Sequence, residues 1–144
     1  MTSSDPYDLQ RFIDAQRASY TRAVNELKAG RKQSHWIWYI FPQIQGLGRS
    51  AMAQTYAIAS LDEAKAYLDH PILGPRLREC TRLVTAMKGS PIEDILSYPD
   101  DLKFHSSMTL FAHAAPDNQI FLDVLKIFFR AEFDGATLTL LRRF

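Results

Sequence analysis

The sequence KQSHWIWYIFPQIQGLGRS, residues 32–50, decides how this chain is expected to fold. Residues 36–41 are all apolar or aromatic, and the chain then passes through a proline break into a Gly-Leu-Gly turn. Arg49 is the only full charge between Gln33 and Leu61, so most of this segment should be buried. Polar side chains inside it need hydrogen-bond partners once water is removed. The segment therefore indicates either a binding site or a heavily hydrogen-bonded part of the core.

The aromatic run at residues 36–41 fits a strand or a helix by composition, because its six residues show no period. A strand needs a partner, and every other apolar segment of the chain has the spacing of a helix or the composition of a turn. We therefore predict a short buried helix that ends before Pro42.

Apolar residues at three- and four-residue steps predict a first helix over residues 9–27, ending at Gly30. Pairs of Ser and Glu three residues apart predict further helix starts at Ser60 and Ser90. The other helices are expected over residues 36–41, from about residue 50, and over 73–88, 100–114, 120–128 and after 134. The predicted fold is all-α, a single domain over residues 1–144 with about seven or eight helices and a disordered tail at 1–6.

Composition bounds the function. A chain of 144 residues that is 47% hydrophobic and 23% charged is typical of one globular domain. Its formal net charge of +1 gives no field toward nucleic acid, and no apolar run approaches the length that spans a bilayer. The polar N-terminus and the single cysteine fit a reducing compartment. We expect a cytoplasmic protein that binds neither nucleic acid nor membrane.

A second stretch without full charges, residues 104–116, follows Lys103. We expect this stretch and the first one to face each other across one pocket. If the pocket is catalytic, His35 is the preferred general base, and Ser106 or Ser107 is the nucleophile or hydrogen donor. Metal and cofactors are not indicated, because the four histidines have no close ligand spacing and Cys80 lies on an apolar helical stripe.

An anion site is expected at the Gly-Leu-Gly turn. Gly46 and Gly48 allow the backbone to curl toward a ligand, and a helix starting near Ser50 would favour a negative group. The alternative is that the glycines only form a tight turn and that Arg49 pairs with a carboxylate. The other residues expected at the pocket are two cations, three groups for polar recognition and an aromatic wall: Lys32, Lys103, Ser34, His35, Gln43, Trp36 and Trp38.

Three blocks of sequence carry a resemblance to a known family. They are SHWIWYIFPQ with GLGRS at residues 34–50, HPILGPRLRE at 70–79 and DDLKFHSSMTLF at 100–111. In this order they resemble domain of unknown function 1810, a family of short bacterial and fungal proteins, some of which carry the label calpastatin. The resemblance implies a compact all-α fold and no established activity. The family's usual Lys-Leu in the third block is Lys103-Phe104 here, an exchange of one apolar residue for another.

Three interpretations of function remain open at this stage. The first is a small-molecule binding domain for an anionic, phosphate-bearing and nucleotide-like ligand, and the sequence does not decide whether it is also an enzyme. The second is a helical protein-interaction module. The third is a homodimer whose interface uses Phe128, Phe129 and Phe133, since one helix cannot turn all three inward.

Overall fold

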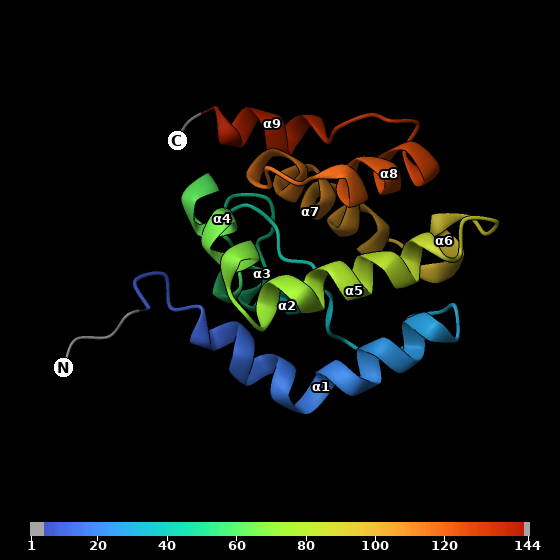
Figure 1. The fold of residues 1–144 in the computed structure, drawn as a ribbon, viewed down its shortest axis with the longest axis horizontal. Helices are drawn as coiled ribbons and strands as arrows, with labels where there is room; N and C mark the ends of the chain where they lie inside the picture. The colour runs from blue at the N-terminus through green and yellow to red at the C-terminus, as the bar shows by residue number, and fades with distance from the viewer. Residues whose placement is uncertain (1–4, 143–144) are drawn as a thin grey trace.

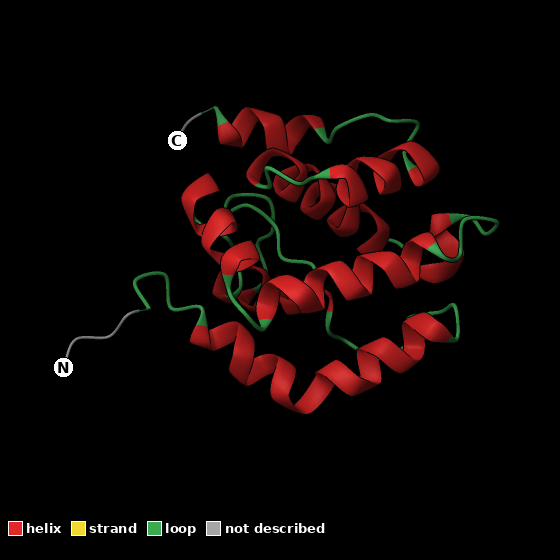
Figure 2. Cartoon of the chain, viewed as in Figure 1, coloured by secondary structure: helices red, strands yellow, loops and turns green. Residues whose placement is uncertain are grey.

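The computed structural model describes residues 5–142, which form nine α-helices and no strand (Figures 1 and 2). The predicted all-α class is confirmed, and the number of helices is slightly higher than expected. The difference comes from helices of only four or five residues: α2 (Ile37–Ile40), α3 (Ala51–Thr55) and α6 (Ile92–Ile95). Of the predicted tail, residues 1–4 lie outside the described residues. The Asp5 carboxylate accepts hydrogen bonds from the backbone N–H groups of Leu9 and Gln10.

Two long helices, α1 (Gln10–Lys28) and α5 (Leu73–Thr85), pack side by side, with α1 at the lower edge of the view and α5 across its middle (Figure 1). The chain leaves α1 through Gly30, whose φ of +84° is in the left-handed region that glycine adopts most readily. The predicted end of the first helix is thereby confirmed.

Side-chain caps begin two other helices where the sequence predicts them. Ser60 Oγ accepts from the N–H of Glu63 at the start of α4 (Leu61–Asp69), at 3.1 Å. The Asp134 carboxylate accepts from the N–H of Thr137 at the start of α9 (Gly135–Leu141), at 3.0 Å. Such caps stabilise a helix by about 0.5–2 kcal/mol.

After Ser90 a helix begins as predicted, α6 at Ile92, but the side-chain cap expected from Ser90 is not formed in the described structure. Pro91 itself occupies the cap position of α6, with an extended ψ of 146°, and its side chain cannot accept a hydrogen bond. Ser90 instead donates its backbone N–H to the carbonyl of Met87.

The central element of the fold is α7 (Asp100–Ala114), which packs against α2, α4, α9 and α8 (Gln119–Phe128) (Figure 1). Ten of its fifteen residues are buried. A helix surrounded by neighbours has no face for charged side chains. This position explains why residues 104–116 carry no full charge.

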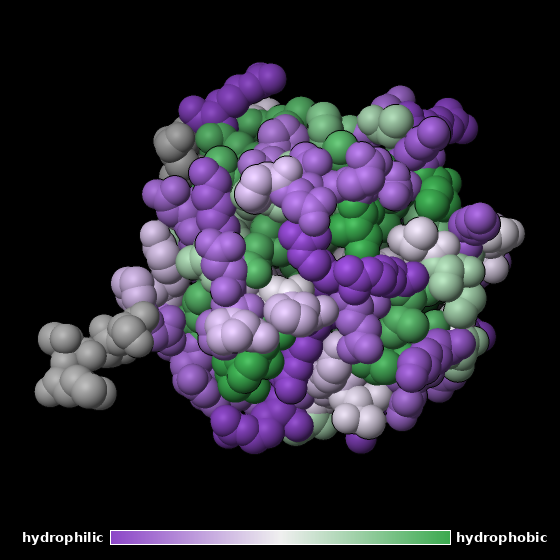
Figure 3. Space-filling view, in the orientation of Figure 1, coloured by the Kyte–Doolittle hydropathy of each residue, from purple (hydrophilic) through white to green (hydrophobic). Residues whose placement is uncertain are grey.

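The aromatic run forms the short buried helix α2, as predicted, and packs onto α7. The rings of Phe41 and Phe104 meet edge to face, with centroids 4.7 Å apart, and Trp36 is only 1% exposed. Polar residues cover most of the face shown in Figure 3, with apolar areas between them. None of the helices among residues 5–142 is long and apolar enough to cross a bilayer.

Candidate functional site

The loop after α2 folds back on itself and lines an open cavity. The N–H of Gln45 donates to the carbonyl of Ile58, and the N–H of Ile58 donates to the carbonyl of Gln43, both at 2.8 Å. These bonds form one isolated parallel bridge between Ile44 and Ile58, and α3 lies in the chain between them. The cavity has a volume of about 380 Å³ and is lined by Gln43, Ile44, Gln45, Gly46, Gly48, Arg49, Ala53, Gln54 and Ala57.

At both glycines of the loop, backbone conformation or packing disfavours any larger residue. Gly46 has a φ of +107°, and a Cβ there would lie 3.1 Å from the side chain of Leu140 in α9. A Cβ on Gly48 would lie 2.3 Å from the Cβ of Ala53, which is too close for any side chain. Ser50 Oγ caps α3 by accepting from the N–H of Ala53. The start of α3 is therefore as predicted, but one of its N–H groups is already bonded.

Arg49 is the only formally charged residue that lines this cavity. Its guanidinium is exposed and takes part in none of the ion pairs found among residues 5–142. The expected alternative, a carboxylate partner for Arg49, is therefore not seen in the described part of the chain. Its backbone carbonyl accepts a hydrogen bond from Gln54 Nε2, which ties α3 to the turn.

The other two predicted cations lie elsewhere and already bind an anion. Lys32 Nζ is 2.7 Å from the Asp100 carboxylate, and Lys103 Nζ is 3.5 Å from it. Neither lysine lines the loop cavity. Lys103 Nζ also lies 5.8 Å from the ring centroid of Trp38. The structure thus separates Arg49 from the lysine pair, and the carboxylate of Asp100 occupies the position between the two lysines.

The SHW segment is bonded to α1. The Glu26 carboxylate accepts from the backbone N–H groups of Gln33 and Ser34, from Ser34 Oγ and from Trp36 Nε1, at 2.6–3.0 Å. Burial by itself would raise the pKa of Glu26, but these hydrogen bonds outweigh it and lower the pKa from 4.5 to about 2. Ser34 and Trp36 therefore serve the packing of this turn, while His35 between them is exposed.

The two predicted serines are buried in α7. Ser106 Oγ accepts from Gln43 Nε2 at 2.6 Å and donates toward carbonyls of the preceding turn, the nearest being that of Lys103 at 3.0 Å. Ser107 Oγ and Trp38 Nε1 are buried and have no hydrogen-bond partner among residues 5–142. Within the described residues no hydrogen bond joins His35 to either serine, so a catalytic role for these three residues stays a prediction.

The two charge-poor stretches touch each other directly, but the loop cavity is lined by residues of the first stretch alone, so the expected pocket between the two stretches is not seen there. Phe41 against Phe104 and Gln43 against Ser106 join them directly. Four of the predicted site residues line one cavity, the loop cavity: Gln43, Gly46, Gly48 and Arg49. This cavity lies beside the contact between the two stretches.

Sequence reasoning missed a residue that supports the loop from α1. The guanidinium of Arg11 donates to the carbonyls of Thr55 and Ala57, at 2.9 and 2.8 Å, and pairs with Glu63 at 2.8 Å. Ala57 lines the cavity, so Arg11 fixes one of its walls. Gln45 and Gln54 were missed too, because nothing in the local pattern separates a lining amide from a surface one.

Chemistry based on a thiol or a metal ion finds no support in the described residues. Burial raises the pKa of the Cys80 thiol to about 12, which keeps it protonated and unreactive at neutral pH. No group of three or more His, Cys, Asp or Glu side chains between residues 5 and 142 is arranged to hold a metal ion.

The sequence profile of a family described as "Protein of unknown function (DUF1810)" matches residues 6–141. The chain belongs to this family. A crystal structure of a conserved hypothetical protein from Mycobacterium tuberculosis has the same fold as this family member, with a TM-score of 0.94 and 52% sequence identity. The match covers 96% of this chain and 99% of the mycobacterial one. No curated protein matches the sequence. The resemblance seen in the three sequence blocks is confirmed.

Proposed function

We propose that this protein binds a small metabolite with a phosphate or carboxylate group, and that the group binds to Arg49 in the loop cavity. One observation carries the proposal. Arg49 is the sole charge among the nine lining residues, and its guanidinium has no acidic partner in the described structure. An unpaired guanidinium beside a cavity offers a fork of N–H donors suited to a planar or tetrahedral anion.

The rest of the lining suits a compact polar ligand. Gln43, Gln45 and Gln54 supply carboxamides, which both donate and accept hydrogen bonds, and no carboxylate opposes an anion. A volume of about 380 Å³ is at the lower end of small-molecule pockets, which span roughly 300–1,000 Å³. Trp36 and Trp38 do not line the cavity, so a base would lack the aromatic wall expected from the sequence. This favours a compact phosphorylated or carboxylated metabolite over a whole nucleotide.

The test is a thermal-shift and calorimetric screen of phosphorylated sugars and small carboxylates, each against its neutral counterpart. A ligand at about 100 times its Kd should stabilise the wild type by roughly 2.7 kcal/mol. Arg49→Ala should weaken binding about tenfold or more, because a charge-assisted hydrogen bond contributes roughly 1.5–3 kcal/mol. Its unfolding free energy should stay within about 0.5 kcal/mol of the wild type.

The matched control is Arg17→Ala, which removes an exposed arginine of α1 outside the cavity. It should leave binding unchanged. Equal affinity of the wild type and Arg49→Ala for the best anionic ligand would refute the proposal. The same would hold if neutral counterparts bound as tightly as the anions.

We propose that this binding takes place in the cytoplasm. Cys80 is a free, buried thiol, and proteins without disulfides are typical of reducing compartments.

A further inference from the structure

Two glutamines that line the loop cavity, Gln43 and Gln54, have carboxamides whose orientation is fixed by hydrogen bonds to the protein. A carboxamide can be turned so that its oxygen and nitrogen exchange places, and its hydrogen-bond partners decide between the two orientations. In both residues the nitrogen is bonded to an acceptor of the protein. The oxygen is therefore the atom that remains for a ligand.

The orientation of Gln54 follows from its partner. Its Nε2 donates to the backbone carbonyl of Arg49 at 2.8 Å. A carbonyl oxygen only accepts hydrogen bonds, so the reversed carboxamide would place two oxygen atoms against each other. The bond also holds this carboxamide next to the one residue of the lining that carries a formal charge.

The orientation of Gln43 follows from the single proton of Ser106. Gln43 Nε2 lies 2.6 Å from Ser106 Oγ, and a hydroxyl can both donate and accept. The same Oγ lies 3.0 Å from the carbonyl of Lys103 and 3.3 Å from that of Leu102, in the preceding turn of α7. A serine in a helix commonly donates to these carbonyls. With its proton used there, Ser106 accepts from the nitrogen of Gln43.

The two Oε1 atoms have no partner of their own. No hydrogen bond among residues 5–142 ends on either of them. Gln54 is exposed, and Oε1 of the half-buried Gln43 is not among the buried atoms that lack a partner, so both oxygens are open to a ligand. The lining thus combines one cationic donor, the guanidinium of Arg49, with two neutral acceptors.

We infer that the anion bound at Arg49 also carries a hydroxyl group close to its charged group, and that Gln43 and Gln54 accept hydrogen bonds from such hydroxyls. The ligand class is then a hydroxylated phosphate or carboxylate, such as a polyol phosphate or a hydroxy acid. A plain alkyl phosphate would cover the two acceptors without satisfying them, which costs binding free energy. This inference rests on the proposed function of the loop cavity and narrows its ligand.

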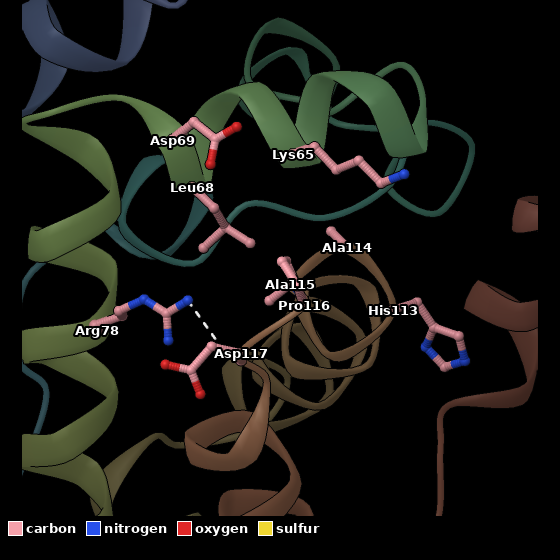
Figure 4. A pocket seen from close by; sticks show the side chains of 9 residues that line it. All are labelled: Lys65, Leu68, Asp69, Arg78, His113, Ala114, Ala115, Pro116 and Asp117. Carbon is pink, nitrogen blue, oxygen red and sulfur yellow. Dashed lines mark hydrogen bonds between the residues drawn. The ribbon is translucent and has the colours of Figure 1, made fainter.

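A larger cavity, of about 520 Å³, lies between α4, α5 and the turn that follows α7 (Figure 4). Its two basic side chains, Lys65 and Arg78, lie on opposite sides of an apolar middle, and its two acidic side chains, Asp69 and Asp117, are likewise apart. These charges do not converge on one small ligand. This cavity therefore provides a control for anion binding away from Arg49.

The first experiment is a calorimetric titration of the full chain with four phosphate esters of similar size. Hydroxyethyl phosphate and glycerol phosphate carry hydroxyl donors, propyl phosphate carries none, and methoxyethyl phosphate keeps the oxygen only as an acceptor. The two hydroxylated esters should bind about two- to tenfold more tightly than the other two. This is the range that one net neutral hydrogen bond contributes.

The second experiment uses variants of similar side-chain length. Gln54→Met and Gln43→Met each remove one acceptor and leave Arg49 in place. Each should reduce the preference for hydroxyethyl over propyl phosphate about two- to fivefold, while the affinity for propyl phosphate stays within about twofold of the wild type. A structural role alone would weaken both esters equally and leave their ratio unchanged.

Two control variants accompany them. Gln119→Met removes an exposed glutamine of α8 that also donates through its Nε2, to Asp123 at 2.7 Å, and lies outside the cavity. Lys65→Gln removes an exposed cation of the cavity in Figure 4. Both should bind all four esters like the wild type. Circular dichroism and the unfolding midpoint verify that each variant is folded, and the exposed position of Gln54 makes Gln54→Met the safer of the two tests.

Three outcomes would overturn the inference while the proposed function stands, with Arg49→Ala still weakening every ester. They are equal affinity of the wild type for hydroxyethyl and propyl phosphate, tighter binding of methoxyethyl than of hydroxyethyl phosphate, and an unchanged preference in both methionine variants of the cavity. Equal affinity of the wild type and Arg49→Ala, or no binding of any ester, would instead refute the proposed function itself.

Discussion

At the scale of single residues, Glu26 has the clearest energetic role. Its carboxylate accepts four hydrogen bonds from the turn at residues 33–36, and its pKa is about 2 instead of 4.5. Protonation would replace an ionised acceptor with a weaker one in each of these bonds. The ionised form therefore stabilises the junction between α1 and the aromatic segment.

Glu26→Gln should lower the free energy of unfolding at pH 7 by about 1–3 kcal/mol, because the amide is neutral and has only one acceptor oxygen. Folding lowers the pKa of Glu26 from 4.5 to about 2, so the ionised carboxylate stabilises the folded state at pH values above 4.5. This stabilisation is lost as the pH falls from 4.5 toward 2. The gap between the wild type and the variant should therefore narrow between pH 5 and roughly pH 2. Urea unfolding at several pH values measures it.

The control for this prediction is Glu93→Gln, an exposed carboxylate at the start of α6. Its effect should be within about 0.5 kcal/mol at pH 7. If the gap between the wild type and Glu26→Gln were the same at pH 3 and pH 7, the lowered pKa would not be the source of the stabilisation.

At the scale of elements, Arg11 joins α1 to α4, to the end of α3 and to the residues just after α3. All five donors of its guanidinium are used: they bond to four backbone carbonyls and to Glu63, whose side chain is only 4% exposed. A buried pair of this kind is costly to break from one side, because the remaining charge loses its partner.

Arg11→Ala should therefore lower the free energy of unfolding by about 3–5 kcal/mol. Arg17→Ala, which removes an exposed arginine 3.4 Å from Asp14 on the same helix, should change it by less than about 0.5 kcal/mol. Chemical denaturation followed by tryptophan fluorescence compares the two. An equal, small effect of both substitutions would mean that Glu63 is well solvated without Arg11.

Helices were predictable where a few neighbouring residues determine them. The period of α1, its end at Gly30 and the caps at Ser60 and Asp134 all depend on residues within one turn of each other. At Ser90 the helix start was predicted correctly but the capping role was not, because α6 has a single turn and Pro91 supplies the extended backbone that a capping serine would otherwise have. Local signals decide less when a helix is this short.

The candidate site was less predictable, because a buried helix and the lining of a pocket can both lack charged residues. Residues 104–116 lack charge since α7 is enclosed by four other helices, and sequence alone does not separate this from the lining of a pocket. Asp100 is three residues from Lys103, so their ion pair could have been predicted from the spacing of residues on one helix face. Its contact with Lys32 depends on the tertiary fold.

At the scale of the whole molecule, the proposed homodimer concerns the segment between α8 and α9. Phe128 and Phe129 are half-buried, whereas Phe133 is 40% exposed and its ring meets His113 edge to face. One of the three phenylalanines is thus exposed, as the sequence led us to expect, while the dimer itself stays a prediction.

Light scattering coupled to gel filtration should give twice the 16.5 kDa mass of the chain at high protein concentration. Phe133→Ser should shift the equilibrium to the monomer, because an interface loses a large apolar side chain. Leu102→Ser, which removes an exposed apolar residue at the start of α7, is the control and should not. A mass of one chain at every concentration would rule the dimer out.

Residues from distant parts of the chain contact the loop that lines the cavity. They are Arg11 in α1, Ser106 in α7 and Leu140 in α9. No contiguous fragment shorter than almost the entire polypeptide contains all three. A cut between Arg11 and the loop, or between the loop and Leu140, would leave the loop's own sequence whole and still remove at least one of its supports. The conformation of the loop depends on the complete tertiary structure. Grafting residues 43–58 alone onto another scaffold would therefore not reproduce that conformation.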